Sequence, residues 1–176
     1  MRLFLGCPVP PSSAYEPLTA ELVAQHDASP VAPGSWHVTL RFLGNVPDAA
    51  PVIAALEAAA AGVAAMPCVV RGVGAFPSPQ RARVAWAGVE APGLAALAKR
   101  VVAATAHLGE APDSRDFVAH ATLARLRRPR DVSSWRRHHQ ERLLAEGVID
   151  RVVVFRSALG PDGAAYARLH EANLAT

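Results

Sequence analysis

The chain has 176 residues, of which 51% are hydrophobic and 19% are charged, which excludes a wholly disordered protein and predicts one globular unit. The formal net charge of +3 is too small to indicate a nucleic-acid partner unless the positive charge is locally concentrated. The start of the chain, Met1 to Pro8, is too short and too interrupted by proline for a signal peptide core, and no apolar run approaches the length of a membrane span, so we expect a cytoplasmic protein. We also expect a monomer.

Hydrophobic periodicity and turn residues define the expected elements along the chain. The segment from Ser13 to Glu16 has the form of a capping box, and Asp48 is a suitable N-cap for an alanine-rich helix. Asp162-Gly163 is typical of a tight hairpin turn. In chain order we expect strand 2–7, helix 13–25, strand 36–44, helix 48–65, strands 68–76 and 83–89, helix 92–108, strand 117–126, helix 133–147, and strands 151–158 and 164–170.

This order of elements predicts an α+β fold. Strands occur mostly in pairs between single helices, and the two halves of the chain resemble each other. We expect a single domain over residues 1–176 with two similar lobes of antiparallel sheet, the helices outside and a cleft between the lobes.

A four-residue phrase occurs once in each half, as His37-Val38-Thr39-Leu40 and as His120-Ala121-Thr122-Leu123. In a strand, residues i and i+2 point to the same face, so each copy presents an imidazole beside a hydroxyl. In the first copy the apolar face is formed by Trp36, Val38, Leu40 and Phe42, and the opposite face by His37, Thr39 and Arg41. Two such faces around one bound group would supply acid–base chemistry on a phosphate.

Arginines follow the second phrase directly, at positions Arg125, Arg127, Arg128, Arg130, Arg136 and Arg137. Guanidinium groups match phosphate geometry, so this stripe predicts a footprint for an RNA backbone, with a solvated surface as the equal alternative. Candidate substrate-binding residues are Arg125, Arg41, Arg127 and Arg130. Strict alternation places Arg125 on the face opposite His120, so Arg125 reaches the site only if the strand bends or ends there.

The remaining histidines and the cysteines predict no metal site and no cofactor. His138 and His139 lie on a predicted helix among arginines, and adjacent helical residues do not share a face, so we interpret them as surface residues. Cys7 and Cys68 are far apart in the sequence and are expected to be buried free thiols, with a disulfide as the open alternative.

The sequence resembles the two-histidine phosphoesterases, and within them the bacterial RNA 2′,3′-cyclic phosphodiesterases, also called 2′-5′ RNA ligases. The resemblance is carried by Trp36 to Gly44, by His120 to Arg125, and by three supporting stretches at 1–4, 76–86 and 157–166. It implies a bilobal α+β fold with pseudo-twofold symmetry and a central cleft. The chain departs from the family in having Ala119 where proline is frequent, and in lacking an acidic residue near Cys7-Pro8.

The resemblance also implies a reaction and a role for each motif side chain. RNA ends that carry a 2′,3′-cyclic phosphate would be opened to 2′-phosphates without a metal, with ligation as the reverse reaction. His37 would be the proton donor and His120 the proton acceptor, and Thr39 and Thr122 would hold the phosphate oxygens. Two alternatives stay open: a non-catalytic module that binds RNA ends or nucleotides, and a phosphodiesterase of a small cyclic nucleotide.

Overall fold

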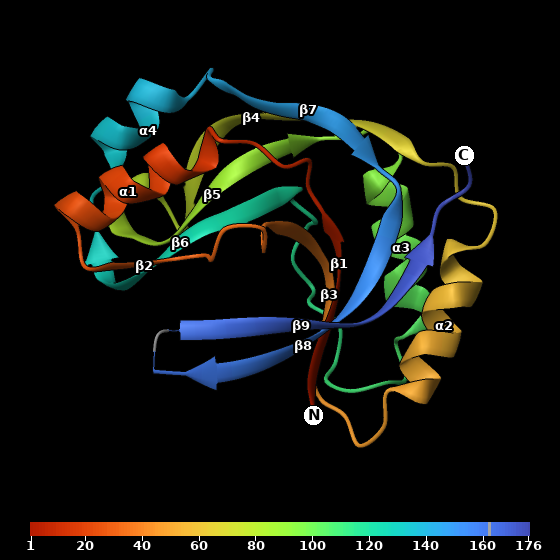
Figure 1. Ribbon diagram of the computed structural model, residues 1–176. Coiled ribbons are helices and arrows are strands. Elements are labelled where there is room, and N and C mark those ends of the chain that lie inside the picture. Colours follow the sequence, from red (N-terminus) through yellow and green to blue (C-terminus); the bar gives the residue numbers. More distant parts are fainter. Residues whose placement is uncertain (162) are drawn as a thin grey trace.

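The structure is a computed structural model that describes residues 1–161 and 163–176. Nine strands form one sheet in the order β7-β4-β5-β6-β3-β1-β8-β9, and β2 pairs with β6 (Figure 1). The strands are β1 (Arg2–Pro8), β2 (Ala28–Pro30), β3 (His37–Asn45), β4 (Met66–Phe76), β5 (Ala82–Glu90), β6 (His120–Arg130), β7 (Leu143–Ile149), β8 (Arg151–Gly160) and β9 (Gly163–Asn173). The helices are α1 (Tyr15–Gln25), α2 (Ala50–Ala60), α3 (Leu94–Ala104) and α4 (Ser133–His139).

The sheet divides into two lobes at the boundary between β3 and β6, and the predicted α+β class is confirmed. The first lobe contains β3, β1, β8 and β9, and α2 and α3 pack against it. The second lobe contains β6, β5, β4 and β7, and α1 and α4 pack against it. The two lobes are joined into one continuous antiparallel sheet by the pairing of Val38 on β3 with Ala121 on β6.

Two connecting helices cross from one lobe to the other. Helix α1 follows β1 of the first lobe but packs against β6 and β2. Helix α3 follows β5 of the second lobe but packs against β3. This exchange is the same in both directions, as expected for two lobes related by a pseudo-twofold axis, and each motif strand packs against a helix that follows a strand of the other lobe.

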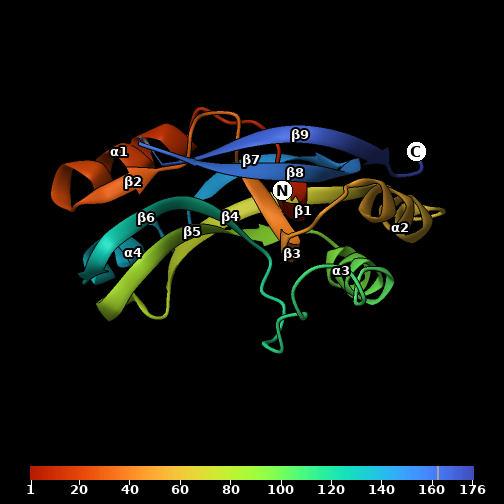
Figure 2. The ribbon, with the colours of Figure 1, turned by 90° about the horizontal axis from the view of Figure 1, so that it is seen from below.

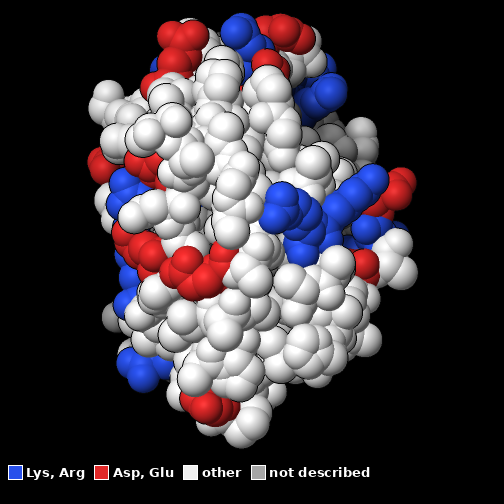
Figure 3. Space-filling model, turned by 90° about the vertical axis from the view of Figure 1, so that its right-hand side faces the viewer, with Lys and Arg blue, Asp and Glu red and all other residues white. Residues whose placement is uncertain are grey.

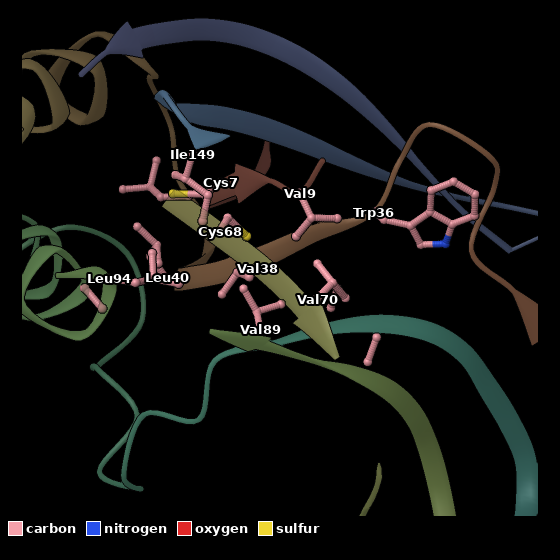
Figure 4. Close-up of a cluster of buried hydrophobic side chains, with 14 of the residues drawn as sticks. Cys7, Val9, Trp36, Val38, Leu40, Cys68, Val70, Val89, Leu94 and Ile149 are labelled. Atoms are coloured by element: carbon pink, nitrogen blue, oxygen red, sulfur yellow. The ribbon is translucent and has the colours of Figure 1, made fainter. Parts of the chain in front are cut away.

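The sheet curls, and the main hydrophobic core lies between the sheet and its helices (Figures 2 and 4). Val38, Leu40 and Leu123 point into this core, so the residues that alternate with them occupy the other face. Cys7 and Cys68 are buried free thiols, as predicted. Burial raises the pKa of the Cys7 thiol to about 12 and that of the Cys68 thiol to about 11, which keeps both protonated and apolar in character.

Each motif strand contains a bulge directly after its threonine. On β3, Thr39 pairs with Gly6 and Arg41 pairs with Leu5, so Leu40 is an extra residue. On β6 the same irregularity falls at Leu123, between Thr122 and Ala124. A bulge shifts the alternation of every residue that follows it. We therefore find that two predictions for β3 are wrong: Arg41 is buried and Phe42, which was expected in the core, is 37% exposed.

Most predicted elements are present, but several boundaries differ. The predicted helix over 133–147 ends at His139, and the strand β7 follows it because its main chain pairs with β4. The capping box is wrong, since α1 begins at Tyr15 and the Ala14 amide donates to Ser12 Oγ. The N-cap of α2 is Ala49 and not Asp48 as predicted, although Asp48 Oδ1 accepts a 3.0 Å hydrogen bond from the Ala50 amide just before the helix.

The β8–β9 hairpin agrees with its prediction, whereas the position of His139 does not. Strands β8 and β9 pair out to Gly160 and Gly163, as expected, and Asp162 of the predicted turn lies outside the described residues. The surface location predicted for His139 is wrong. Its side chain is buried, and Nε2 lies 2.8 Å from Glu21 Oε2, which links α4 to α1.

The face that carries α2 and α3 is mostly uncharged, with its charged side chains in small separate groups (Figure 3). Within residues 1–161 and 163–176, no helix has both the length and the apolar character needed to cross a membrane.

Candidate active site

The four motif side chains lie on the face of the sheet opposite the main core, which we call the motif face. His37, Thr39, His120 and Thr122 are half-buried, and they alternate with fully buried neighbours in both strands. The antiparallel pairing of Val38 with Ala121 places His37 alongside Thr122 and Thr39 alongside His120. Each histidine is therefore grouped with its own threonine and with the threonine of the other copy.

The two imidazoles are held by the same backbone device. His37 Nδ1 lies 2.8 Å from the carbonyl oxygen of Ser35, and His120 Nδ1 lies 2.6 Å from that of Val118. A carbonyl oxygen can only accept, so Nδ1 carries the proton in both rings and donates it. This fixes the tautomer and leaves each Nε2 available to give or take a proton.

His37 lies against an aromatic wall built from three strands of the first lobe. Its ring is stacked 4.9 Å from Phe4 and lies 5.1 Å from Phe155, and Tyr166 meets it edge-on at 5.3 Å. These contacts come from β1, β8 and β9, and they restrict the imidazole to one orientation. The segments that carried the resemblance contain Phe4 and Tyr166 but not Phe155, and no sequence pattern indicated that these rings lie beside His37.

Gly6 allows His37 to lie close to the sheet. A Cβ atom at Gly6 would stand 2.7 Å from the carbonyl oxygen of Val38 and 3.2 Å from Cδ2 of His37. A side chain there would displace either the β3 backbone or the imidazole. The glycine is thus part of the positioning of His37, through the space that it leaves open.

His120 has a smaller aromatic wall in the second lobe. Phe76 on β4 meets its ring edge-on at 5.0 Å, and Trp86 on β5 lies 5.9 Å away. The rings that surround the two histidines therefore occupy related positions in the two lobes, but the wall of the first lobe is more extensive. The two copies of the motif are placed symmetrically and surrounded unequally.

The electrostatic environment lowers the pKa of both histidines below their ordinary value. For His37 burial is the main cause, and the positive charges of Arg125 and of His120 lower the pKa further. For His120 burial is again the main cause, and Arg125 adds to it. The hydrogen bond to the backbone carbonyl opposes these effects in each case. One guanidinium thus acts on both imidazoles.

Arg125 reaches the motif face because of the bulge at Leu123. Strict alternation would place it on the opposite face, but the extra residue buries Ala124 and leaves Arg125 exposed. Among residues 1–161 and 163–176 its guanidinium forms no ion pair with a carboxylate. It is therefore a charge that an anionic ligand between the histidines could share.

Arg41 does not face the site, which corrects its selection as a candidate substrate-binding residue. It is 4% exposed, and its guanidinium donates to the carbonyl oxygens of Phe42 at 2.6 Å, Leu108 at 3.3 Å, Ala111 at 3.4 Å and Glu110. Arg41 thereby fastens the connection between α3 and β6 to the end of β3. Its role is structural.

The other two arginine candidates lie further along β6. Arg127 is exposed, and its Nε lies 3.7 Å from Oδ1 of Asp27, so part of its charge is compensated. Arg130 is exposed at the last position of the strand.

In the described part of the chain, no three His, Cys, Asp or Glu side chains form a group that could hold a metal ion.

Comparisons with known proteins agree with the two-motif arrangement. The family model of the 2′-5′ RNA ligase superfamily matches residues 9–161. The chain is 33% identical over 172 residues to the RNA 2′,3′-cyclic phosphodiesterase of Archaeoglobus fulgidus. This alignment covers 94% of this chain and 96% of that protein. A protein of the same name from Aeropyrum pernix is 30% identical over 102 residues, or 56% of this chain and 57% of that protein.

Solved structures share the whole architecture. The protein TT0787 of Thermus thermophilus is 31% identical, with a TM-score of 0.76 over 99% of this chain and 98% of that chain. The structure of E. coli LigT complexed with 3′-AMP has a TM-score of 0.74 at 23% identity over the same shares, which shows the likeness of fold. The two curated relatives are archaeal, so the match does not support restricting the resemblance to the bacterial enzymes. The chain belongs to the 2′-5′ RNA ligase superfamily, whose model covers most of its length and both motifs.

Proposed function

We propose that this protein hydrolyses the 2′,3′-cyclic phosphate at RNA ends to a 2′-phosphate, by general acid and base catalysis with two histidines. The observation that carries the proposal is the paired tautomer device: His37 and His120 both donate through Nδ1 to a carbonyl two residues earlier. Both Nε2 atoms are therefore free for proton transfer, on one face of one sheet. The curated relative from Archaeoglobus fulgidus, which is named as an RNA 2′,3′-cyclic phosphodiesterase, supports the substrate class.

The reaction needs one proton taken and one given. In the proposed step the neutral Nε2 of His120 accepts a proton from water as the water oxygen bonds to phosphorus. The bond between phosphorus and the ribose 3′ oxygen breaks, and Nε2 of His37 donates its proton to that oxygen. The product carries a 2′-phosphate and a 3′-hydroxyl, and solvent returns the two histidines to their starting states.

The surroundings of the two histidines support this division of roles. The leaving 3′ oxygen belongs to the terminal ribose, so the proton donor must lie on the side that receives the nucleoside. Phe155 and Tyr166 give the first lobe, next to His37, the aromatic surface that suits a ribose and its base. Water needs no such surface, and the smaller wall beside His120 is in keeping with the role of base.

Three further side chains would bind the phosphate. Thr39 and Thr122 would donate hydroxyl hydrogen bonds to the two non-bridging oxygens, one from each motif strand. Arg125 would pair with the same anion, since it lies close enough to lower the pKa of both histidines. A bound phosphodiester anion in turn favours the protonated form of His37, which offsets the lowering of its pKa by burial.

The test is an assay of the purified protein on an RNA oligomer with a 2′,3′-cyclic phosphate, in excess chelator. We expect turnover, and we expect the phosphorus NMR spectrum to show a 2′-phosphomonoester as the product. No turnover, or a 3′-phosphate product, would contradict the proposal. Addition of an RNA with a 5′-hydroxyl end then measures ligation, because that hydroxyl can replace water as the nucleophile.

A further inference from the structure

A hollow of about 780 Å³ opens beside His37, and neither motif histidine lines it. Two register pairs fix its position. Pro8, which lines the hollow, pairs with His37, and Arg168, which also lines it, pairs with Phe155 of the aromatic wall. Both pairs place the hollow next to the aromatic wall of His37, at the end of β1 where Pro8 lies.

One part of the wall of the hollow is apolar and rich in proline. Pro8, Pro10 and Pro11 come from the end of β1 and the loop after it, and Pro33 and Trp36 come from the segment that leads into β3. The rings of Pro8, Pro11 and Pro33 are at least partly exposed and offer apolar surface without strongly hydrated groups, against which a nucleobase can pack, whereas Pro10 and Trp36 are buried. The volume lies within the range of small-molecule sites, which is about 300–1,000 Å³.

The charges in the hollow are already compensated. Arg151 pairs with Asp150 at 2.8 Å and with Glu171 at 3.1 Å, and Arg168 pairs with Glu171 at 2.9 Å. These pairs lower the pKa of Asp150 and Glu171, so both carboxylates stay ionised near neutral pH. Glu16 adds a further exposed carboxylate. Two carboxylates (Glu16 and Asp150) and two guanidiniums (Arg151 and Arg168) line the hollow, and Glu171 pairs with both guanidiniums, so the hollow has no uncompensated positive charge for a phosphate and suits an uncharged group.

We propose that this hollow binds the base of the second nucleotide from the RNA end, and so makes the enzyme select oligonucleotides over cyclic mononucleotides. The inference rests on the proposed function, which places the terminal nucleoside over the aromatic wall of His37. The nucleotide before it then extends past His37 toward Pro8, and the hollow is where its base meets a surface that fits. A carboxylate such as Glu16 accepts hydrogen bonds from the exocyclic amino group of adenine or cytosine.

The experiment compares kcat/KM on adenosine 2′,3′-cyclic phosphate with kcat/KM on the dinucleotide ApA that ends in a 2′,3′-cyclic phosphate. Burial of one base against the apolar part of the wall predicts that the wild-type protein prefers the dinucleotide by about 5- to 100-fold. Val148→Trp and Ser13→Trp would each fill the hollow from a different wall, since both residues line it and both are exposed. We expect each to abolish most of the preference and to leave the mononucleotide rate within about twofold of wild type.

Val23→Trp is the matched control. Val23 is an exposed valine on α1 that does not line the hollow, so the same substitution there should keep the preference for the dinucleotide. Equal wild-type rates on the two substrates would overturn the proposal. A preference that survives in both filled variants would also overturn it, and so would equal losses on both substrates in both variants.

The outcome separates this proposal from the proposed function. If the wild-type protein hydrolyses neither substrate, the phosphodiesterase assignment fails. If it hydrolyses the two substrates equally well, the phosphodiesterase assignment stands and the subsite fails. The second result would favour a small cyclic nucleotide as the substrate.

Discussion

Val38 and Ala121 are direct partners across the boundary between the lobes, and each is the middle residue of its His-x-Thr motif. A pseudo-twofold axis through this pair relates the two motifs, so the four catalytic candidates are placed by one backbone register. The symmetry also relates Phe42 to Arg125, the first exposed residues after the two bulges. One lobe thus presents an aromatic ring where the other presents a cation.

Removal of either imidazole should abolish most of the activity. We expect His37→Ala and His120→Ala each to lower kcat on a cyclic-phosphate RNA by about 10²–10⁴-fold, because each removes one proton transfer. The control is His107→Ala, an exposed histidine remote from both motifs in the sequence. Near wild-type turnover by either motif variant would show that the two-histidine mechanism is wrong.

The motif threonines should act through their hydroxyl groups and not through their volume. Thr39→Val and Thr122→Val keep the shape of the side chain but remove a donor to a charged oxygen, so we expect kcat to fall on the order of 10²-fold. Thr39→Ser and Thr122→Ser keep the hydroxyl and should retain most of the rate. The threonines would be structural if the valine and serine variants behaved alike in steady-state kinetics.

The pH dependence follows from the lowered pKa values of both histidines. The proposed mechanism needs His120 neutral and His37 protonated, so kcat/KM should be bell-shaped, with its maximum on the acid side of pH 6.5. The rate should fall as pH rises, since His37 loses its proton.

Arg125 tests the origin of that profile. Arg125→Gln removes a positive charge that lowers both pKa values, so the whole bell should move to higher pH as kcat/KM falls. Arg125→Lys keeps the charge and should leave the position of the bell close to that of wild type. An unmoved profile in Arg125→Gln would show that the guanidinium does not act on the histidines.

Gly6 should be sensitive to the smallest possible side chain. Gly6→Ala would force a Cβ against the Val38 carbonyl and the His37 ring, so we expect a loss of about 1–3 kcal/mol in the free energy of unfolding and a lower kcat. Gly160→Ala is the control, because the nearest atom to its Cβ would be a carbonyl oxygen at 3.6 Å. Urea denaturation and the cyclic-phosphate assay measure the two effects; wild-type behaviour of Gly6→Ala would contradict the close approach.

Arg41 should matter for stability more than for chemistry. Arg41→Met leaves carbonyl oxygens of the α3–β6 connection without their charged donor, and we expect the free energy of unfolding to fall by about 2–3 kcal/mol. Arg128→Met, at an exposed position of β6, should change it by less than about 0.5 kcal/mol. A large change in KM without a change in urea stability would instead favour contact with substrate.

Local patterns were sufficient to predict the motif face but not its details. Alternation in β3 separates His37 and Thr39 from the core because it involves neighbours within one strand. The bulges at Leu40 and Leu123 each add one residue, which no hydrophobic pattern marks, and they decide that Arg125 is exposed on the motif face and Arg41 is buried. Side-chain direction was therefore predictable up to each bulge; beyond it, strict alternation was wrong for Arg41 and Phe42, and Arg125 reaches the motif face because the bulge supplies the bend that this required.

Long-range pairing explains the other differences. Residues 143–149 carry two leucines and an isoleucine that suit a helix or a strand equally, and their pairing with β4 decides between them. His139 is buried because α4 meets Glu21 of α1, a contact between distant parts of the chain. The aromatic wall of His37 likewise combines β1 with β8 and β9, which sheet order alone brings together.

The sheet order has a consequence for how the protein is made. The second lobe is formed by β4 to β7, a continuous middle stretch, whereas the first lobe joins β1 and β3 to the last two strands. As a chain leaves the ribosome, the surroundings of His120 can therefore be complete before β8 and β9 have been synthesised. His37 acquires Phe155 and Tyr166 last, so a polypeptide that stops short of β9 would contain both histidines and only one finished half of the active site.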